Sequence, residues 1–209
     1  MVNKINLGIL VSGSGTNLQS IIDNCKSDRI DALVKVVISD SPEAFAIERA
    51  KKNNIDTVTV VRSEFDSRKS FEKKIVEILQ SHKVELVCLA GFMRIIGKTL
   101  LGAYPNRIIN IHPALLPSFP GLDGQKQAYD YGVKIAGCTM HFVDDKVDHG
   151  PIICQSSVPV MEDDTPQTLK DRILEEEHRI YPQAIQLYAE GKLKIKNRRV
   201  YILNESDKG

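Results

Sequence analysis

The stretch INLGILVSGSGTNLQSII, residues 5–22, decides the fold. Its first seven residues are almost all apolar, which is typical of a strand buried on both faces of a sheet. A turn of glycine, serine and threonine follows, and then a helical pattern in which Leu18, Ile21 and Ile22 share one face. A strand, a tight turn and a helix in this order predict the first unit of an α/β fold with a parallel sheet.

The turn at residues 12–17 is also a candidate anion site, because backbone N–H groups are free at the start of a helix and the helix dipole favours negative charge there. The third glycine of a dinucleotide motif is missing, since Leu18 stands in its place, and no P-loop lysine follows. We therefore expect a phosphate monoester rather than a pyrophosphate. A tight turn without a ligand is the alternative.

The same alternation of apolar runs and helical patterns continues along the chain. Strands are expected at residues 5–11, 33–39, 56–61, 84–90, 107–112, 135–143 and 152–160, the last two paired as a hairpin. Ser41 and Thr165, each followed by proline, are expected to cap helices. The order predicts a mainly parallel sheet of about seven strands with helices on both faces. Residues 193–203 suggest an edge strand or hairpin. One domain, 1–209, is expected, with halves 1–105 and 106–209.

Composition excludes several classes of protein. Hydrophobic residues make up 42% and charged residues 26%, and the net charge is +1, so no nucleic-acid or membrane partner is expected. The four cysteines are far apart in sequence and are expected to be reduced. No signal peptide and no apolar stretch of about 20 residues is present, which favours a cytoplasmic location.

The stretch NIHPALLPSFPG, residues 110–121, is the main candidate for chemistry. Asn110 and His112 alternate along a strand and should face the same side. Three prolines then stiffen the loop at the carboxyl end of that strand, where ligands bind in open α/β sheets. The alternative is that Asn110 caps the strand and His112 is a satisfied buried histidine.

The polar residues favour acyl transfer in which the substrate supplies the nucleophile. No G-x-S-x-G motif is present, and Cys154 lies inside a predicted strand. Asn110 and His112 can stabilise a developing oxyanion, and Asp148 can orient His112. The apolar residues 91–96, at the end of another strand, suit a flat heterocycle. A metal site built from His112, His141, His149 and the aspartates at 144, 145 and 148 has no supporting spacing, and none is expected; His141 is interpreted as a packed histidine.

Four segments resemble the family of phosphoribosylglycinamide formyltransferases: residues 11–19, 90–95, 110–117 and 148–153. The resemblance extends over nearly the whole chain. It implies a Rossmann-like formyltransferase fold of class α/β. It also implies transfer of a formyl group from 10-formyltetrahydrofolate, as co-substrate and without a metal, to the amine of glycinamide ribonucleotide in purine biosynthesis.

The resemblance also carries site residues onto this chain. It implies the catalytic residues Asn110, His112 and Asp148. The ribonucleotide is expected at Gly15, Thr16, Asn17 and Glu177. The folate is expected at Arg68, Met93, Arg94, Ile95, Ile96, Asn110, Val143, Asp144 and Asp148. The chain departs from the family at residues 123–125, where relatives often carry a histidine-containing stretch, and at His149, where the residue is usually small.

Three rival functions remain open at this point. Another enzyme that uses 10-formyltetrahydrofolate, such as a hydrolase or a methionyl-tRNA formyltransferase, usually carries an additional domain, for which 209 residues leave no room. A nicotinamide-dependent oxidoreductase is supported only by Gly13, Gly15 and the acidic Asp40. A non-catalytic ligand-binding module is the third. The substrates are expected to be small molecules, and the protein is expected to be a monomer or a homodimer.

Overall fold

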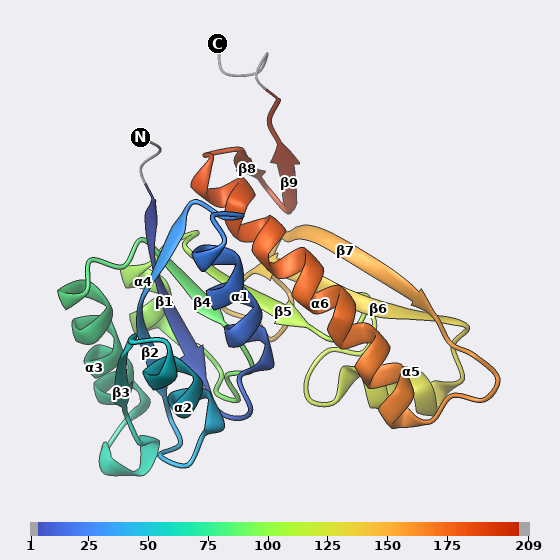
Figure 1. Cartoon of the computed structure of the whole chain (residues 1–209), viewed down its shortest axis with the longest axis horizontal. Helices are drawn as coiled ribbons and strands as arrows, with labels where there is room; N and C mark the ends of the chain where they lie inside the picture. The colour runs from blue at the N-terminus through green and yellow to red at the C-terminus, as the bar shows by residue number, and fades with distance from the viewer. Residues whose placement is uncertain (1–3, 205–209) are drawn as a thin grey trace. The chain divides into compact units, whose positions relative to one another are not determined.

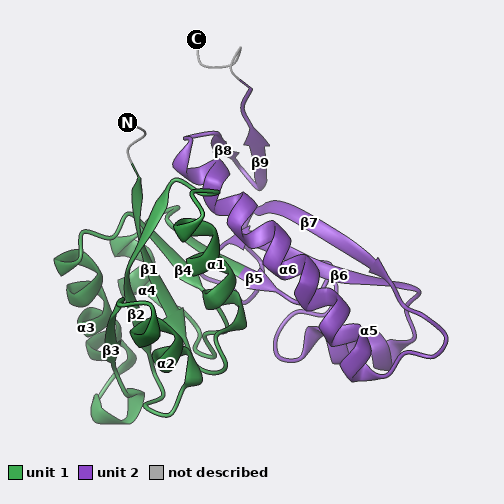
Figure 2. Ribbon diagram, viewed as in Figure 1, with its two compact units in different colours: residues 1–110 green, residues 111–209 purple. Residues whose placement is uncertain are grey.

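The computed structural model describes residues 4–204 and divides into two compact units, residues 1–110 and 111–209 (Figure 2). Unit 1 contains a repeated alternation of strands and helices (Figure 1). Its elements are β1 (Ile5–Val11), α1 (Thr16–Lys26), β2 (Ala32–Ser39), α2 (Phe45–Lys52), β3 (Asp56–Thr59), η1 (Arg62–Glu64), α3 (Arg68–Ser81), β4 (Leu86–Leu89) and α4 (Lys98–Ala103). Strand β5 (Ile108–His112) begins in unit 1.

The strands of unit 1 follow the order β3-β2-β1-β4-β5, and every pair is parallel. Crossovers between parallel strands are right-handed, so the two helices formed while the chain runs from β1 to β3 lie on one face of the sheet, and the two formed after the direction reverses lie on the other. Accordingly, α1 packs with α2 and α3 packs with α4. Strand β1 lies at the centre, and its residues Leu7, Ile9, Leu10 and Val11 are completely buried. The doubly wound order predicted from the sequence is confirmed.

Unit 2 is built on antiparallel pairs. Its elements are α5 (Gly124–Tyr131), β6 (Ile135–Phe142), β7 (Ile152–Pro159), α6 (Pro166–Ala189), β8 (Leu193–Lys196) and β9 (Arg199–Ile202). Strands β6 and β7 form the expected hairpin, α6 packs on both, and α5 packs on α6. Strand β9 lies parallel to β7 and antiparallel to β8.

The expected count of about seven strands is wrong, because residues 4–204 contain nine. The two additional strands are β8 and β9, where the sequence left open a single edge strand or a hairpin. Their alternation of basic and apolar residues is that of a pair with one face in water.

One predicted helix start is also wrong. Helix α2 begins at Phe45 with Ala44 at its N-cap, and not at Ser41 and Pro42. The Ser39 hydroxyl donates to the Ser41 carbonyl and accepts from the Ser41 N–H, so the segment forms a turn first. The short helix α4 was not expected, because six residues give too little periodicity to detect.

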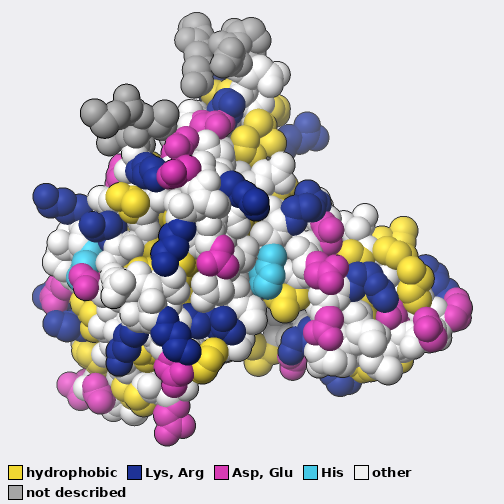
Figure 3. Space-filling model, in the orientation of Figure 1, with side chains coloured by type: hydrophobic (Ala, Val, Ile, Leu, Met, Phe, Trp, Pro, Cys, Tyr) yellow, Lys and Arg dark blue, Asp and Glu magenta, His cyan; other side chains and the backbone are white. Residues whose placement is uncertain are grey.

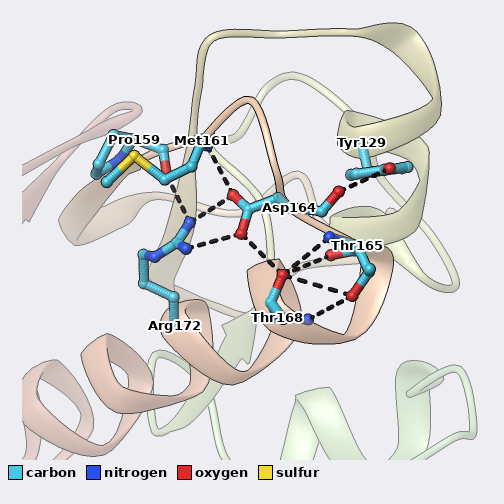
Figure 4. Close-up of polar contacts among 7 residues, drawn as sticks. All are labelled: Tyr129, Pro159, Met161, Asp164, Thr165, Thr168 and Arg172. Atoms are coloured by element: carbon cyan, nitrogen blue, oxygen red, sulfur yellow. Dashed lines mark hydrogen bonds and ion pairs between the residues drawn. The ribbon is translucent and has the colours of Figure 1, made fainter.

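The start of α6 is held by a buried carboxylate. Thr165 caps the helix and Pro166 occupies its first turn, as predicted. Asp164 accepts two hydrogen bonds from Arg172, both at 2.7 Å, one from the Thr168 hydroxyl at 2.8 Å and one from the Met161 N–H at 2.7 Å (Figure 4). The hydrogen bonds from Arg172 hold the pKa of Asp164 well below its usual range. Asp164 therefore ties the loop after β7 to the first turns of α6.

We expect Asp164→Asn to lower the midpoint of thermal unfolding by about 5 °C at pH 7, because Arg172 would lose a charged partner of matching geometry. Asp163→Asn is the control, because it replaces a carboxylate by an amide at the neighbouring residue. Scanning calorimetry of both variants measures the difference. Equal midpoints in the two variants would contradict the role given to Asp164.

The surface carries both signs of charge. On the face shown in Figure 3, acidic and basic side chains are interspersed over the residues of each unit. Among the helices of residues 4–204, none is long and apolar enough to cross a bilayer.

Candidate active site

The turn after β1 has the geometry expected of an anion site. Gly15 is the N-cap of α1 and adopts a left-handed conformation with φ of 71°. A Cβ on Gly15 would lie 2.6 Å from the Cβ and 2.8 Å from the Cα of Ala46, so α2 leaves room only for glycine. The Ala46 N–H donates to Gly13, and Arg49 Nε donates to the Ser14 carbonyl at 2.8 Å.

The first N–H groups of a helix have no partner within the helix, and part of the turn before α1 is open to solvent. Gly13 and Ser14 are exposed, and Thr16 and Asn17 are the first two residues of an 11-residue helix. Helix N–H groups, the positive end of the dipole and the nearby Arg49 guanidinium together suit a singly attached phosphate.

We expect Gly15→Ala to raise the KM for a phosphorylated substrate at least tenfold and to destabilise the protein by about 1–3 kcal/mol, because alanine is strained at this φ and would collide with Ala46. Steady-state kinetics and chemical denaturation measure the two effects. Gly102→Ala is the control, since nothing lies within 4 Å of the added Cβ. An unchanged KM in Gly15→Ala would exclude a phosphate at this turn.

The loop after β4, residues 91–97, is anchored at both ends within unit 1. The Ser12 hydroxyl accepts from the Met93 N–H at 2.8 Å, and so joins the loop to the anion turn. The carboxylate of Glu72, which is 3% exposed, accepts from the Gly97 N–H at 2.5 Å. Arg68, the first residue of α3, lies 3.9 Å from Glu72 through its Nε atom. No local pattern in the sequence singles out Glu72.

Three apolar residues of this loop differ in exposure. Met93 and Ile95 are 62% and 59% exposed, whereas Ile96 is 7% exposed and belongs to the core. Large apolar side chains at the surface are a typical feature of ligand sites. Met93 and Ile95 therefore offer apolar side chains to a ligand, whereas Ile96 does not.

Asp40, the acid at the end of β2, holds Arg94. Its Oδ2 accepts from Arg94 Nε at 2.5 Å, and the Asp40 side chain is buried. In the sequence, Asp40 is a candidate acceptor for a nicotinamide ribose. The residue instead fixes the direction of the Arg94 guanidinium, which is half exposed.

In unit 2, His112 at the end of β5 lies between two oxygen acceptors. Its Nδ1 is 3.3 Å from Oδ2 of Asp148, and its Nε2 donates to the Phe119 carbonyl at 2.8 Å. Asp148 Oδ2 also accepts from the Gly121 N–H at 2.8 Å. The proline-rich loop therefore holds both His112, through the Phe119 carbonyl, and Asp148, through the Gly121 N–H. Both residues are catalytic candidates from the sequence.

The protonation states of the pair follow from burial. Burial lowers the pKa of His112 below its usual value, and Asp148 and the Phe119 carbonyl offset this only in part. Burial also opposes ionisation of Asp148. Hydrogen bonds from His141 and Gly121, together with the electrostatic effect of the His112 and His141 imidazoles, outweigh burial and lower the pKa of this carboxyl. At neutral pH, Asp148 is thus charged and His112 can accept a proton.

His141 is a residue of this cluster that sequence reasoning missed. It was interpreted as a packed histidine, and it is 2% exposed, yet its Nε2 lies 3.7 Å from Asp148 Oδ1. Its Nδ1 donates to the Phe142 carbonyl at 2.8 Å. The signal in the sequence was that the strand carrying His141 leads into the acidic loop, but a strand residue can face either side.

The remaining predicted residues are placed as follows. Val143 and Asp144 begin the loop between β6 and β7, and Asp144 accepts from His149 Nδ1 at 2.7 Å. Glu177 lies in α6 and is 7% exposed. Asn110 lies on β5 two residues before His112 and is half-buried. Within residues 4–204, no group of three or more acidic, histidine or cysteine side chains is arranged to hold a metal ion.

The fold and these groups are those of an α/β group-transfer enzyme. The model of the formyl transferase family matches residues 5–185. The chain therefore belongs to the formyl transferase family, which confirms the resemblance drawn from the sequence.

Three individual relatives are similar to this chain over most of its length. Phosphoribosylglycinamide formyltransferase of Bacillus subtilis is 44% identical over 85% of this chain and 91% of its own length, and that of Escherichia coli is 39% identical over 95% and 93%. The crystal structure of glycinamide ribonucleotide transformylase 1 from Symbiobacterium toebii superposes with a TM-score of 0.96 at 53% identity, covering 98% of this chain and 96% of that chain.

Proposed function

We propose that the protein transfers the formyl group of 10-formyltetrahydrofolate to the amine of glycinamide ribonucleotide in purine biosynthesis. The observation that carries the proposal is the pairing of His112 with Asp148. It occurs in a chain that is 39% to 53% identical to proteins named phosphoribosylglycinamide formyltransferase or glycinamide ribonucleotide transformylase. No metal takes part in the proposed reaction.

The proposed chemistry needs no protein nucleophile. The substrate amine attacks the formyl carbon, a C–N bond forms, the bond to the folate nitrogen breaks, and the amine proton ends on that nitrogen. The Asn110 amide and His112 donate hydrogen bonds to the formyl oxygen as it gains negative charge. One such donor typically contributes about 3 kcal/mol, or roughly a hundredfold in rate.

The contacts of His112 suggest how each step is supported. Nε2 donates to a carbonyl oxygen, that of Phe119, so this nitrogen is placed and protonated for a C=O acceptor. In the proposed reaction, the formyl oxygen replaces the Phe119 carbonyl at Nε2. A proton taken up at Nδ1 lies beside the Asp148 carboxylate, which stabilises the imidazolium.

The remaining predicted site residues are proposed to bind the two substrates. The anion turn, with Gly15, Thr16 and Asn17, holds the phosphate of the ribonucleotide, and Glu177 lies near its ribose. The folate is held by Arg68, Met93, Arg94, Ile95, Ile96, Asn110, Val143, Asp144 and Asp148. The support is the exposure of Met93 and Ile95 and the fixed direction of Arg94. We further propose that residues 1–209 act as one formyltransferase domain in the cytoplasm, as a monomer or a homodimer.

A steady-state assay tests the proposal. The purified protein is mixed with glycinamide ribonucleotide and 10-formyltetrahydrofolate, and release of tetrahydrofolate is followed by absorbance and formylated product by mass spectrometry. We expect formylated product to form in step with tetrahydrofolate. Release of formate without formylated product would instead identify a hydrolase.

A further inference from the structure

The C-terminal hairpin reaches the loop that carries Asp148. Strand β9 lies beside the start of β7, with Arg199 opposite Ile152 (Figure 1). The turn between β8 and β9, residues 197–198, is therefore next to the end of the loop at residues 143–151. All of these residues belong to unit 2.

Arg198 contacts both the backbone and the ring of His149. Its Nη2 donates to the His149 carbonyl at 2.8 Å. Its Nη1 lies 3.1 Å from Nδ1 and 3.0 Å from Nε2 of the imidazole. An atom in the ring plane at equal distance from both nitrogens would collide with the carbon between them. The guanidinium therefore lies over the face of the ring, an arrangement that arginine adopts readily.

Because Arg198 covers the face of His149, the ring edge is left to Asp144. His149 Nδ1 donates to Asp144 Oδ2 at 2.7 Å, and Asp144 Oδ1 accepts from the Lys146 N–H at 3.0 Å. Burial opposes ionisation of Asp144, but these hydrogen bonds, with the charges of His149 and Arg198, lower the pKa of its carboxyl. The group of Asp144, His149 and Arg198, here called the latch, thus joins the two ends of the loop to the hairpin.

Asp148 has a backbone conformation that its surroundings must enforce. Its φ is 48°, in the left-handed region, which costs free energy for a residue with a Cβ. The residue that follows it is His149, whose carbonyl accepts from Arg198. A loop held on both sides of a strained residue keeps that residue in place, whereas a loose loop allows it to relax.

We propose that Arg198 is a positioning residue, which acts through His149 and Asp144 to hold the loop at residues 143–151 so that Asp148 faces His112. The inference rests on the proposed function, since the consequence for turnover depends on Asp148. The resemblance gives no role to Arg198, and it marks His149 only as a departure from the family.

The test is Arg198→Ala in the full chain, with Arg199→Ala as the matched control. Arg199 is the next residue, is exposed, and begins β9, whereas Arg198 lies in the turn before it. We expect Arg198→Ala to lower kcat about tenfold and to raise the KM for 10-formyltetrahydrofolate severalfold, with the KM for the ribonucleotide unchanged within about twofold. Arg199→Ala should match the wild type.

Two further measurements separate positioning from general stability. Amide hydrogen exchange of residues 146–149 should become faster in Arg198→Ala and not in Arg199→Ala, at equal thermal midpoints. Asp144→Asn combined with Arg198→Ala should lower kcat no further than the stronger single variant, because both break one latch.

Three results would overturn the inference. They are equal kcat and equal exchange in Arg198→Ala and Arg199→Ala, a fall in thermal midpoint with kcat retained, and full additivity with Asp144→Asn. A wild-type protein that forms no formylated product would instead remove the proposed function. The exchange rates of residues 146–149 would still decide whether Arg198 holds the loop.

Discussion

Asp148→Asn is expected to lower kcat by a thousandfold or more, about the loss seen when a carboxylate that orients a catalytic histidine becomes an amide. The asparagine oxygen can still accept from the Gly121 N–H, so the loop keeps its shape. The negative charge beside Nδ1 of His112 disappears, and with it the stabilisation of an imidazolium. The defect should therefore fall on turnover and leave the KM for the ribonucleotide almost unchanged.

The measurement is single-turnover formyl transfer at saturating substrates. Asp145→Asn removes a charge from the same loop, at an exposed residue, and is the control. If Asp148→Asn kept the kcat of Asp145→Asn, the carboxylate would have no part in the reaction.

His112→Ala is expected to lower kcat by about a hundredfold to ten-thousandfold, the range for a general acid–base group that also binds an oxyanion. The side chain is 3% exposed, so its removal also leaves a small cavity and an unpaired Phe119 carbonyl, and some loss of stability should accompany the loss of turnover. His112→Gln, which keeps an N–H donor, should recover part of the stability and little of the activity.

His82→Ala, which removes a histidine outside the proposed site, is the control for His112→Ala. His82 follows α3 in unit 1, and its ring contacts Ser81, Ile78 and Asp56. Circular dichroism should show folded protein in all of these variants. A turnover of His112→Ala equal to that of His82→Ala would remove the imidazole from the mechanism.

Local patterns alone determined most of the elements. The apolar run at residues 5–11, the glycine turn before Thr16, and the Thr165-Pro166 start of α6 each depend on neighbours within a few residues. The predicted helix start at Ser41-Pro42 was wrong because the Ser39 side chain forms a hydrogen bond that stabilises a turn there instead. The hairpin at residues 193–202 could be suspected but not separated from one edge strand.

The site divides in the same way. The sequence determined which residue types are present and at which strand ends they lie, because alternation and turn chemistry are local properties; Gly15, His112 and Asp148 were identified on that basis. Only the tertiary structure decided the pairings: Asp40 with Arg94, 54 residues apart, Asp148 with Gly121, 27 apart, and Arg198 with His149, 49 apart. Such contacts form because packing of the strands and helices brings distant segments together, and no local preference of a residue determines which partner it meets.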